Sequence, residues 1–264
     1  MIKKVVYSYW SKPTTNTATN FAGFNSKEAF SNCAKLSVLK SKTWAKKVEL
    51  VTDKKGKKLL IDELNLPFDN VIVELDKLNN IKNKHWAIGK LYACSIQEEP
   101  FMHLDFDAIW FKKPPRKILK APACFQNWEK NTDTHKYYKK LIDTCITTPN
   151  LKIHKYSDFK QINALNCGFI GFNDLTKLKL WYELALDYIE KTDKKTKKDM
   201  IPCIMFEQYY IGSILKHFNI PVETLGEEWV EEDLAYKLGY THLISESKLD
   251  KEVEKQVYNK VKNL

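Results

Sequence analysis

The sequence predicts one α/β domain whose largely parallel sheet is covered by helices on both faces. Three observations support this fold class. Short apolar, β-branched runs alternate with helical stretches in the first half of the chain, which is the order of a parallel sheet. A hydrophobic content of 44% suits an ordinary folded core. A length of 264 residues allows one large domain, and no internal repeat or clear linker divides it.

The first half of the chain predicts four strands separated by three helices. The expected strands are residues 3–9, 47–53, 70–75 and the apolar run that starts at Phe101, and the expected helices are residues 25–39, 57–65 and 85–97. Asn25 is followed three residues later by Glu28, a pattern that resembles a capping box, so we expect the first helix to open there. The βαβαβαβ order predicts that the four strands run parallel.

Fewer elements are predicted in the second half. They are a strand over residues 165–173, a helix that begins at Asp174, a helix over residues 202–218, the segment "YTHLISESK" at residues 240–248, and a charged helix that closes the chain. We take these elements as part of the same domain, with the last of them as a C-terminal extension.

The charge of the chain argues against a nucleic-acid partner. The formal net charge is +10, but almost all of it is lysine, since Arg116 is the only arginine. Base readers and phosphate clamps favour the bidentate fork of arginine. The lysine surplus still attracts anions and would allow peripheral contact with an anionic membrane. We expect the lysine-rich run Lys191–Asp199 to be a solvated loop.

The expected location is the cytoplasm. Six cysteines lie far apart without a C-x-x-C pair, which is typical of free thiols in a reducing compartment. The apolar part of the basic N-terminus ends at Ser8, too soon for a secretory segment, and we expect a first strand there. No stretch approaches the roughly 18 apolar residues that span a bilayer.

Two aspartates interrupt the fourth strand, in "FMHLDFDAIWFKKP". Residues two apart in an extended chain point to one side, so Asp105 and Asp107 face together while Phe106 faces away. Two such charges are unfavourable unless a cation lies between them, and carboxylates without cysteine favour Mg²⁺ or Mn²⁺. The alternative is a strand end whose aspartates cap the next element.

The position of this pair predicts a ligand site. Ligands of open α/β sheets bind at the carboxyl ends of the strands, and the loop over residues 8–25 leaves the first strand at the same edge. Neither G-x-G-x-x-G after the first strand nor G-x-x-x-x-G-K-[ST] is present, so dinucleotide and P-loop sites lack their motifs.

Four segments together resemble the nucleotide-sugar glycosyltransferases of the GT-A fold, in particular the retaining type typified by glycogenin and bacterial galactosyltransferases. The segments are "HLDFDAIWF", "LNCGFIGFN", "FEQYYI" and "HLISESK". They are similar to the family's YLDxDxxv, FNxGxxxxN, DQxxLN and H-x-x-G-x-x-K. Two departures are Glu207 at the acidic position of the third segment and Ser245 at the glycine of the fourth.

The resemblance implies a set of site residues. Asp105, Asp107 and His242 would bind Mn²⁺ (or Mg²⁺), and neutral imidazole suits such a site. The implied donor-binding residues are Tyr7, Ser8, Trp10, Lys90, Asp105, Asp107, Gly168 and Lys248, with Trp10 or Tyr9 stacking on the base. The implied residues at the reacting sugar are Glu207, Gln208 and Asn166.

The implied function is metal-dependent transfer of a sugar from a nucleoside-diphosphate sugar, of the UDP type, to an unknown glycan, lipid or protein acceptor. Residues 1–115 would then be the nucleotide-binding half and residues 116–264 the acceptor-side half. The resemblance implies retention at the anomeric carbon, although Glu207 as a general base would allow inversion. Other functions left open are an inactive sugar- or nucleotide-binding relative, a sugar nucleotidyltransferase, and a basic nucleic-acid-binding protein.

Overall fold

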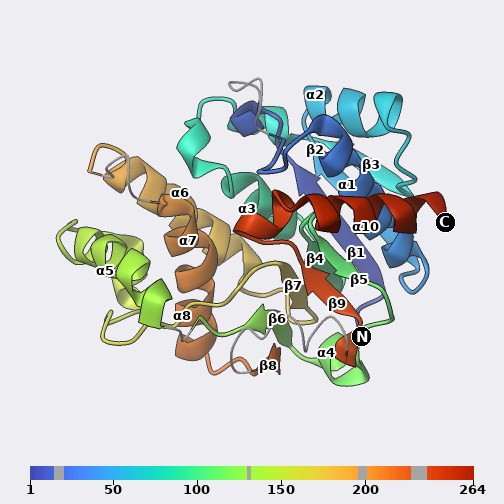
Figure 1. Ribbon diagram of the computed structural model, residues 1–264. Helices are drawn as coiled ribbons and strands as arrows, with labels where there is room; N and C mark the ends of the chain where they lie inside the picture. The colour runs from blue at the N-terminus through green and yellow to red at the C-terminus, as the bar shows by residue number, and fades with distance from the viewer. Residues whose placement is uncertain (15–20, 130–131, 196–200, 227–236) are drawn as a thin grey trace.

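A seven-stranded sheet forms the centre of the molecule (Figure 1), counted over the residues that the structure describes. The computed structural model describes residues 1–14, 21–129, 132–195, 201–226 and 237–264. The strand order is β3-β2-β1-β4-β7-β6-β8. The strands are β1 (Lys4–Tyr9), β2 (Lys47–Thr52), β3 (Asn70–Val73), β4 (Phe101–Leu104), β6 (Ala123–Asn127), β7 (Phe169–Phe172) and β8 (Val222–Gly226).

The sheet is mostly parallel, as predicted. Strand β7 runs antiparallel to both of its neighbours, β4 and β6, and the other pairs of adjacent strands in this sheet are parallel. Because β7 runs in the opposite direction, its beginning lies at the same edge as the carboxyl end of β4. Residues 165–168, which precede β7, are thereby brought beside the residues that follow β4.

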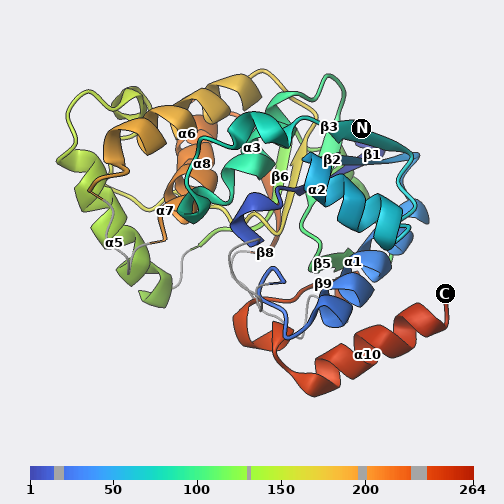
Figure 2. The ribbon, with the colours of Figure 1, turned by 90° about the horizontal axis from the view of Figure 1, so that it is seen from above.

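Helices cover both faces, which confirms the predicted fold class (Figure 2). One face carries α3 (Ile88–Ser95), α5 (Thr132–Ile146), α6 (Leu178–Thr192) and α8 (Tyr210–His217), and the other carries α1 (Lys27–Lys42) and, outside it, α10 (Lys251–Lys262). Shorter helices are α2 (Lys54–Lys57), α4 (Arg116–Lys120) and α7 (Pro202–Ile204), and two π-helical segments are Lys58–Glu63 and Met205–Tyr209.

Each face has its own hydrophobic core. Strand β1 shows how the sequence builds both, because successive side chains of a strand point to opposite faces. Val6 packs into the core under α3 and α6, whereas Val5 and Tyr7 pack into the core under α1. All six cysteines are buried and unpaired, as the prediction of free thiols requires.

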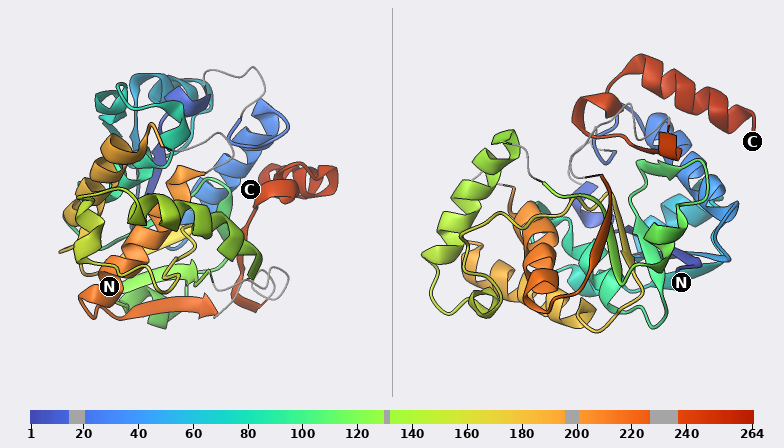
Figure 3. Two further views of the ribbon diagram at one scale, coloured as in Figure 1. Left: turned by 90° about the vertical axis from the view of Figure 1, so that its left-hand side faces the viewer. Right: turned by 90° about the horizontal axis from the view of Figure 1, so that it is seen from below.

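A second, two-stranded sheet joins the C-terminal segment to the site. Strand β5 (Ala108–Trp110) pairs antiparallel with β9 (Tyr240–His242), and Ala108 lies opposite His242. Helix α10 then runs along the outside of the molecule (Figure 3), packed on α1. Within the described ranges, no helix combines the length and the apolar character needed to cross a membrane.

Two local predictions were wrong. Helix α1 is capped by Ser26, whose Oγ accepts a hydrogen bond from the backbone N–H of Ala29 at 3.0 Å, and not by Asn25. The Asn25 amide instead donates to the carbonyl of Leu249 at 2.8 Å. The predicted loop over residues 191–199 is also shorter than expected, because α6 continues through Thr192. Residues 196–199 of that prediction, and residues 15–20 of the predicted N-terminal loop, lie outside the described residues.

Several elements were not predicted from the sequence. They are β6, β8, α4 and α5, all of which come after residue 115. The predicted helix over residues 202–218 is present as α7, a π-helical turn and α8 in succession. A π-helical turn often occurs at a functional site, and this one contains Glu207 and Gln208.

Candidate functional site

A cavity of about 890 Å³ opens at the carboxyl ends of β1 and β4. Several parts of the chain line it, and four of them are residues 8–10 at the end of β1, residues 105–107 after β4, residues 166–168 before β7, and residues 242–246, 248 and 249 around and after the end of β9. Its volume lies within the range of small-molecule sites, roughly 300–1,000 Å³. The antiparallel direction of β7 and the pairing of β9 with β5 bring these four segments together.

The structure brings Asp105, Asp107 and His242 to one wall of this cavity. One possible ligand atom from each residue lies within 4.8 Å of the others. A tight turn after β4 presents the aspartates, with the backbone N–H of Ala108 donating to the carbonyl of Asp105 at 3.0 Å. Phe106 points away between them and packs against Tyr7 with ring centroids 5.0 Å apart. The two aspartates thus face together, as expected from the sequence, but a turn and not an extended strand places them there.

These residues fit a hard divalent cation. Carboxylate oxygens and a neutral imidazole are ligands that Mn²⁺ and Mg²⁺ accept, and the set contains no thiolate. Among the residues that the structure describes, none donates a hydrogen bond of good geometry to Asp107 Oδ1, although this oxygen is buried. Its near neighbour is His242 Nε2, 3.4 Å away. A buried carboxylate oxygen without a donor is suited to a metal ion.

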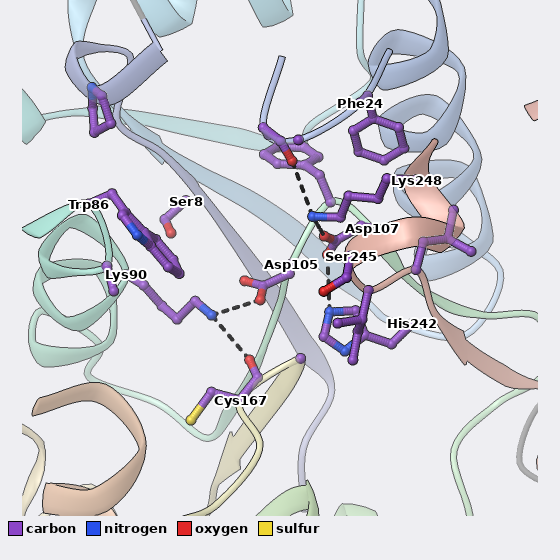
Figure 4. Close-up of a pocket in the computed structure, with 18 of the residues that line it drawn as sticks. Ser8, Phe24, Trp86, Lys90, Asp105, Asp107, Cys167, His242, Ser245 and Lys248 are labelled. Carbon is purple, nitrogen blue, oxygen red and sulfur yellow. Dashed lines mark hydrogen bonds and ion pairs between the residues drawn. The ribbon is translucent and has the colours of Figure 1, made fainter. Parts of the chain in front are cut away.

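Two lysines approach the aspartates from opposite sides (Figure 4). Lys248 forms an ion pair with Asp107. Lys90 lies 2.7 Å from Asp105 Oδ2 and 2.6 Å from Glu207 Oε1, and it donates to the carbonyl of Cys167 at 3.1 Å. The site therefore already contains fixed positive charge on both sides of the carboxylate pair.

The environments of the two aspartates shift their pKa values in opposite directions. Burial raises the pKa of Asp105, an effect that Lys90 opposes and the charge of Asp107 reinforces. Burial also acts to raise the pKa of Asp107, but Lys248 and His242 outweigh it and lower that pKa below its ordinary value. The pKa of Asp107 is thus lowered and its anion favoured, whereas burial disfavours ionisation of Asp105 even beside Lys90.

Glu207 is part of a buried ion pair. It is 2% exposed, and its partner Lys90 is 7% exposed. Burial raises the pKa of Glu207 although Lys90 opposes this effect. Burial alone would lower the pKa of Lys90, but the charges of Asp105 and Glu207 raise it well above its ordinary value. Lys90 is therefore a permanent cation that bridges two carboxylates.

Asn166 and Gln208 line the cavity, and the amide of each forms hydrogen bonds with neighbouring residues. Asn166 donates to Glu129 Oε1 at 2.8 Å and accepts a hydrogen bond from the backbone N–H of Gly168 at 3.0 Å. Gln208 Oε1 accepts a hydrogen bond from the Tyr138 hydroxyl at 2.6 Å. Both amides are oriented by neighbours, and each retains hydrogen-bonding capacity toward a ligand.

Residues 7–10, at the end of β1 and just after it, divide between the cavity and the core. Ser8, Tyr9 and Trp10 line the cavity, and the Ser8 hydroxyl lies 2.8 Å from His103 Nε2. Trp10 is only 6% exposed. Tyr7 does not line the cavity: it is fully buried on the α1 side, where its hydroxyl is 2.8 Å from the hydroxyls of Ser37 and Ser41. Its position in the strand turns it to the opposite face of the sheet. We therefore no longer expect Tyr7 to contact a nucleotide-sugar donor.

Three residues near the site were missed by the sequence analysis. Trp86 points into the cavity and is 47% exposed, which leaves its ring face open for stacking (Figure 4). Glu129 orients Asn166, and burial raises its pKa. Gln126 contacts His242. Trp86 could have been noticed as an aromatic residue at the start of a helix that bears Lys90, but no sequence signal identified Gln126 or Glu129.

Comparisons with known proteins give a family and several similar folds. The sequence model described as "Family of unknown function (DUF6734)" matches residues 3–263. No curated protein matches the chain. Similar solved structures include mouse xyloside xylosyltransferase 1, with 12% identity, 85% of each chain covered and a TM-score of 0.44.

Two other solved structures cover nearly the whole chain. The galactosyltransferase LgtC, in complex with donor and acceptor sugar analogues, is similar over 99% of this chain and 96% of its own, at 9% identity and a TM-score of 0.49. The inositol-1-phosphate CTP transferase from T. maritima is similar over 99% of this chain and 96% of its own, at 12% identity and a TM-score of 0.46. At such identities and TM-scores, these likenesses assign no reaction and no substrate to the chain.

Proposed function

The chain belongs to this family of unknown function, and we propose that it is a metal-dependent glycosyltransferase that takes its sugar from a nucleoside-diphosphate sugar of the UDP type. The observation that carries the proposal is the convergence of Asp105, Asp107 and His242 on one wall of a cavity that two lysines also enter. A site that joins carboxylates, an imidazole and ammonium groups suits a metal-bound diphosphate.

The bond that must break joins the anomeric carbon to the diphosphate, and negative charge grows on the diphosphate as it leaves. Asp105, Asp107 and His242 would hold Mn²⁺ or Mg²⁺, which when bound acts as a Lewis acid on the phosphate oxygens. Lys248 would turn its ammonium from Asp107 to the diphosphate and add positive charge where negative charge develops. These interactions strengthen as the bond breaks, which is the condition for catalysis.

The other residues of the cavity would bind and orient the donor. Asn166 and Gln208, whose amides are held by Glu129 and Tyr138, would hydrogen-bond sugar hydroxyls. Ser8 lies where the chain leaves β1 and would contact the nucleoside. The exposed ring of Trp86 would stack on the base, a role that the buried Trp10 is less able to fill.

We propose retention of the anomeric configuration. An inverting reaction needs a carboxylate that is free to take a proton from the acceptor hydroxyl. Glu207 is buried and lies 2.6 Å from Lys90, so it is committed to an ion pair. Asp105 and Asp107 would be committed to the metal. The acceptor is proposed to be a hydroxyl group of a glycan, lipid or protein.

The test measures the melting temperature with UDP, with Mn²⁺, and with both. We expect stabilisation by UDP to require Mn²⁺ in the unaltered protein and to vanish in Asp107→Asn. Asp62→Asn, a matched change of an exposed acid, should behave as the unaltered protein. Nucleotide sugars are then screened with Mn²⁺ for release of free sugar, which separates an active enzyme from an inactive binding protein. UDP binding that is independent of Mn²⁺, or no UDP binding at all, would refute the proposal.

A further inference from the structure

Gln126 contacts His242 from within the core. It lies near the end of β6 and is 0% exposed. Its Oε1 accepts a hydrogen bond from the Tyr240 hydroxyl at 2.8 Å and lies 2.9 Å from His242 Nδ1. With the amide of Gln126 in this orientation, the imidazole carries a hydrogen on Nδ1, because a carbonyl oxygen can only accept. The contact thereby selects one tautomer of the neutral ring.

The other ring nitrogen faces the aspartates. Since Nδ1 keeps its hydrogen, Nε2 is the atom whose lone pair can bind a metal ion, and it lies 3.4 Å from Asp107 Oδ1. Gln126 thereby directs the metal-binding nitrogen toward the carboxylates.

The contact between Gln126 and His242 is closely packed against Gly168. A Cβ atom at Gly168 would overlap the imidazole of His242 and the Oε1 of Gln126. The same glycine fixes the neighbouring ligand, because its carbonyl accepts a hydrogen bond from the backbone N–H of Asp105 at 3.1 Å. The ring of His242 is therefore held between Gln126 and the residue that positions Asp105.

Gln126 also has an unfavourable feature that its contact with His242 explains. Within the described part of the chain, its Nε2 has no hydrogen-bond acceptor, although it is buried. A buried donor without a partner is destabilising, and in a native structure it calls for a reason. An aliphatic side chain would avoid this orphaned donor but would leave Nδ1 of His242 without an acceptor.

We propose that Gln126 is a positioning residue, which fixes the tautomer and the orientation of His242 for binding a divalent cation. The proposal rests on the proposed metal-dependent function. Hydrogen-bond partners of metal-binding histidines commonly act in this way, and their removal weakens metal affinity about 10- to 100-fold.

The first experiment measures Mn²⁺ affinity from the electron paramagnetic resonance signal of free Mn²⁺. We expect Gln126→Met to weaken binding about 10- to 100-fold and Gln126→Glu, which restores an acceptor for Nδ1–H, to recover most of that loss. Tyr240→Phe is the matched control: it removes the other hydrogen bond to the same oxygen and should leave Mn²⁺ affinity nearly unchanged. Equal weakening by Gln126→Met and Tyr240→Phe would overturn the proposal, because general loosening of the packing would then explain both.

The second experiment needs no metal. Nitrogen-15 NMR of the metal-free protein reports which ring nitrogen of His242 carries the hydrogen. We expect the Nδ1–H tautomer in the unaltered protein and in Tyr240→Phe, and a mixture in Gln126→Met. A ring protonated mainly on Nε2 in the unaltered protein would overturn the inference even if Mn²⁺ binds. If the tautomer is as expected but no Mn²⁺ binds, the proposed metal-dependent function fails instead.

Discussion

Lys248 and Asp107 form an ion pair that joins the 3₁₀-helix Ser245–Lys248 to the turn after β4. Lys248 also donates a hydrogen bond to the carbonyl of Ala22 at 3.1 Å. A divalent cation on Asp107 would repel this ammonium group, because both are positive and close. Lys248 should therefore weaken the binding of a metal ion alone. When a diphosphate is also bound, the Lys248 ammonium can pair with the phosphate oxygens, and Lys248 should then strengthen the binding of the metal–diphosphate complex.

Lys248→Ala is expected to change two affinities in opposite directions. Mn²⁺ alone should bind about 3- to 10-fold more tightly, because a neighbouring like charge is removed. UDP in the presence of Mn²⁺ should bind about 10- to 100-fold more weakly, the loss of one hydrogen bond to a charged group. Calorimetric titration measures both, with the exposed Lys251→Ala as control. If the two affinities fall together, Lys248 is not the exchangeable cation described here.

Asp105→Asn and Asp107→Asn should both abolish Mn²⁺ binding but differ in their effect on the metal-free fold. The pKa of Asp107 is lowered, so its ionised form stabilises the fold above the unfolded pKa, and this contribution is lost as pH falls through the lowered value. The pKa of Asp105 is raised, so its ionisation destabilises the fold as pH rises from the unfolded value, about 3.9, through the raised one.

At pH 7.5, Asp107→Asn should therefore lower the free energy of unfolding by about 1–3 kcal/mol. Asp105→Asn should leave it unchanged or raise it slightly. Urea unfolding with EDTA present measures both, and Asp62→Asn serves as the control. If Asp105→Asn lowers the free energy of unfolding more than Asp107→Asn does, the opposite pKa shifts assigned to the two aspartates are wrong.

Lys90 and Glu207 are expected to be strongly coupled in a double-mutant cycle. Lys90→Met alone leaves two buried carboxylates without their cation and should destabilise the metal-free protein by about 3–5 kcal/mol. Glu207→Gln alone leaves Lys90 with Asp105 and should destabilise it less. The double variant should be more stable than the sum of the two changes predicts, with a coupling energy of about 1–3 kcal/mol from urea unfolding. Additive changes would show that the ion pair does not form in solution.

Gly168→Ala should weaken Mn²⁺ binding more than its effect on stability explains. The added methyl group overlaps the ring of His242, so overpacking should lower the free energy of unfolding by about 1–3 kcal/mol and move the ring away from the aspartates. Gly171→Ala, within β7 and three residues further along the chain, would instead overlap Cys124 Sγ and Ile2 and no proposed metal ligand. This control should lose stability and keep its Mn²⁺ affinity; equal affinity in both variants would contradict the close packing at Gly168.

Much of the sheet could be predicted because strands buried on both faces appear as continuous apolar runs, as in β1, β4 and β7. Strand β6 was missed, although all five of its residues are buried, because it ends in the polar Gln126 and Asn127. The antiparallel direction of β7 could not be predicted from its composition. An apolar run specifies burial, and the direction of pairing depends on partners far away in the sequence.

The site residues likewise include some that could be predicted from the sequence and some that could not. Asp105 and Asp107 could be identified because two acids separated by one residue are expected to face together. His242 and Lys248 could be identified because they match a motif whose imidazole suits a metal ion and whose ammonium suits a diphosphate. Tyr7 and Ser8 are neighbours in β1 and point to opposite faces of the sheet, and the resemblance to the family did not distinguish the two faces. The role of Gln126 depends on the contact of β6 with β9, elements separated by more than a hundred residues.

The distance along the chain between Asp107 and His242 has a consequence for biosynthesis. A nascent chain that has been made only as far as β8 carries both aspartates but not the imidazole. His242, the third proposed ligand, is added only when β9 emerges from the ribosome and pairs with β5. Capture of the ion would therefore mark maturation of the polypeptide, and pulse-labelled chains should gain Mn²⁺-dependent resistance to protease only after that last segment has been translated.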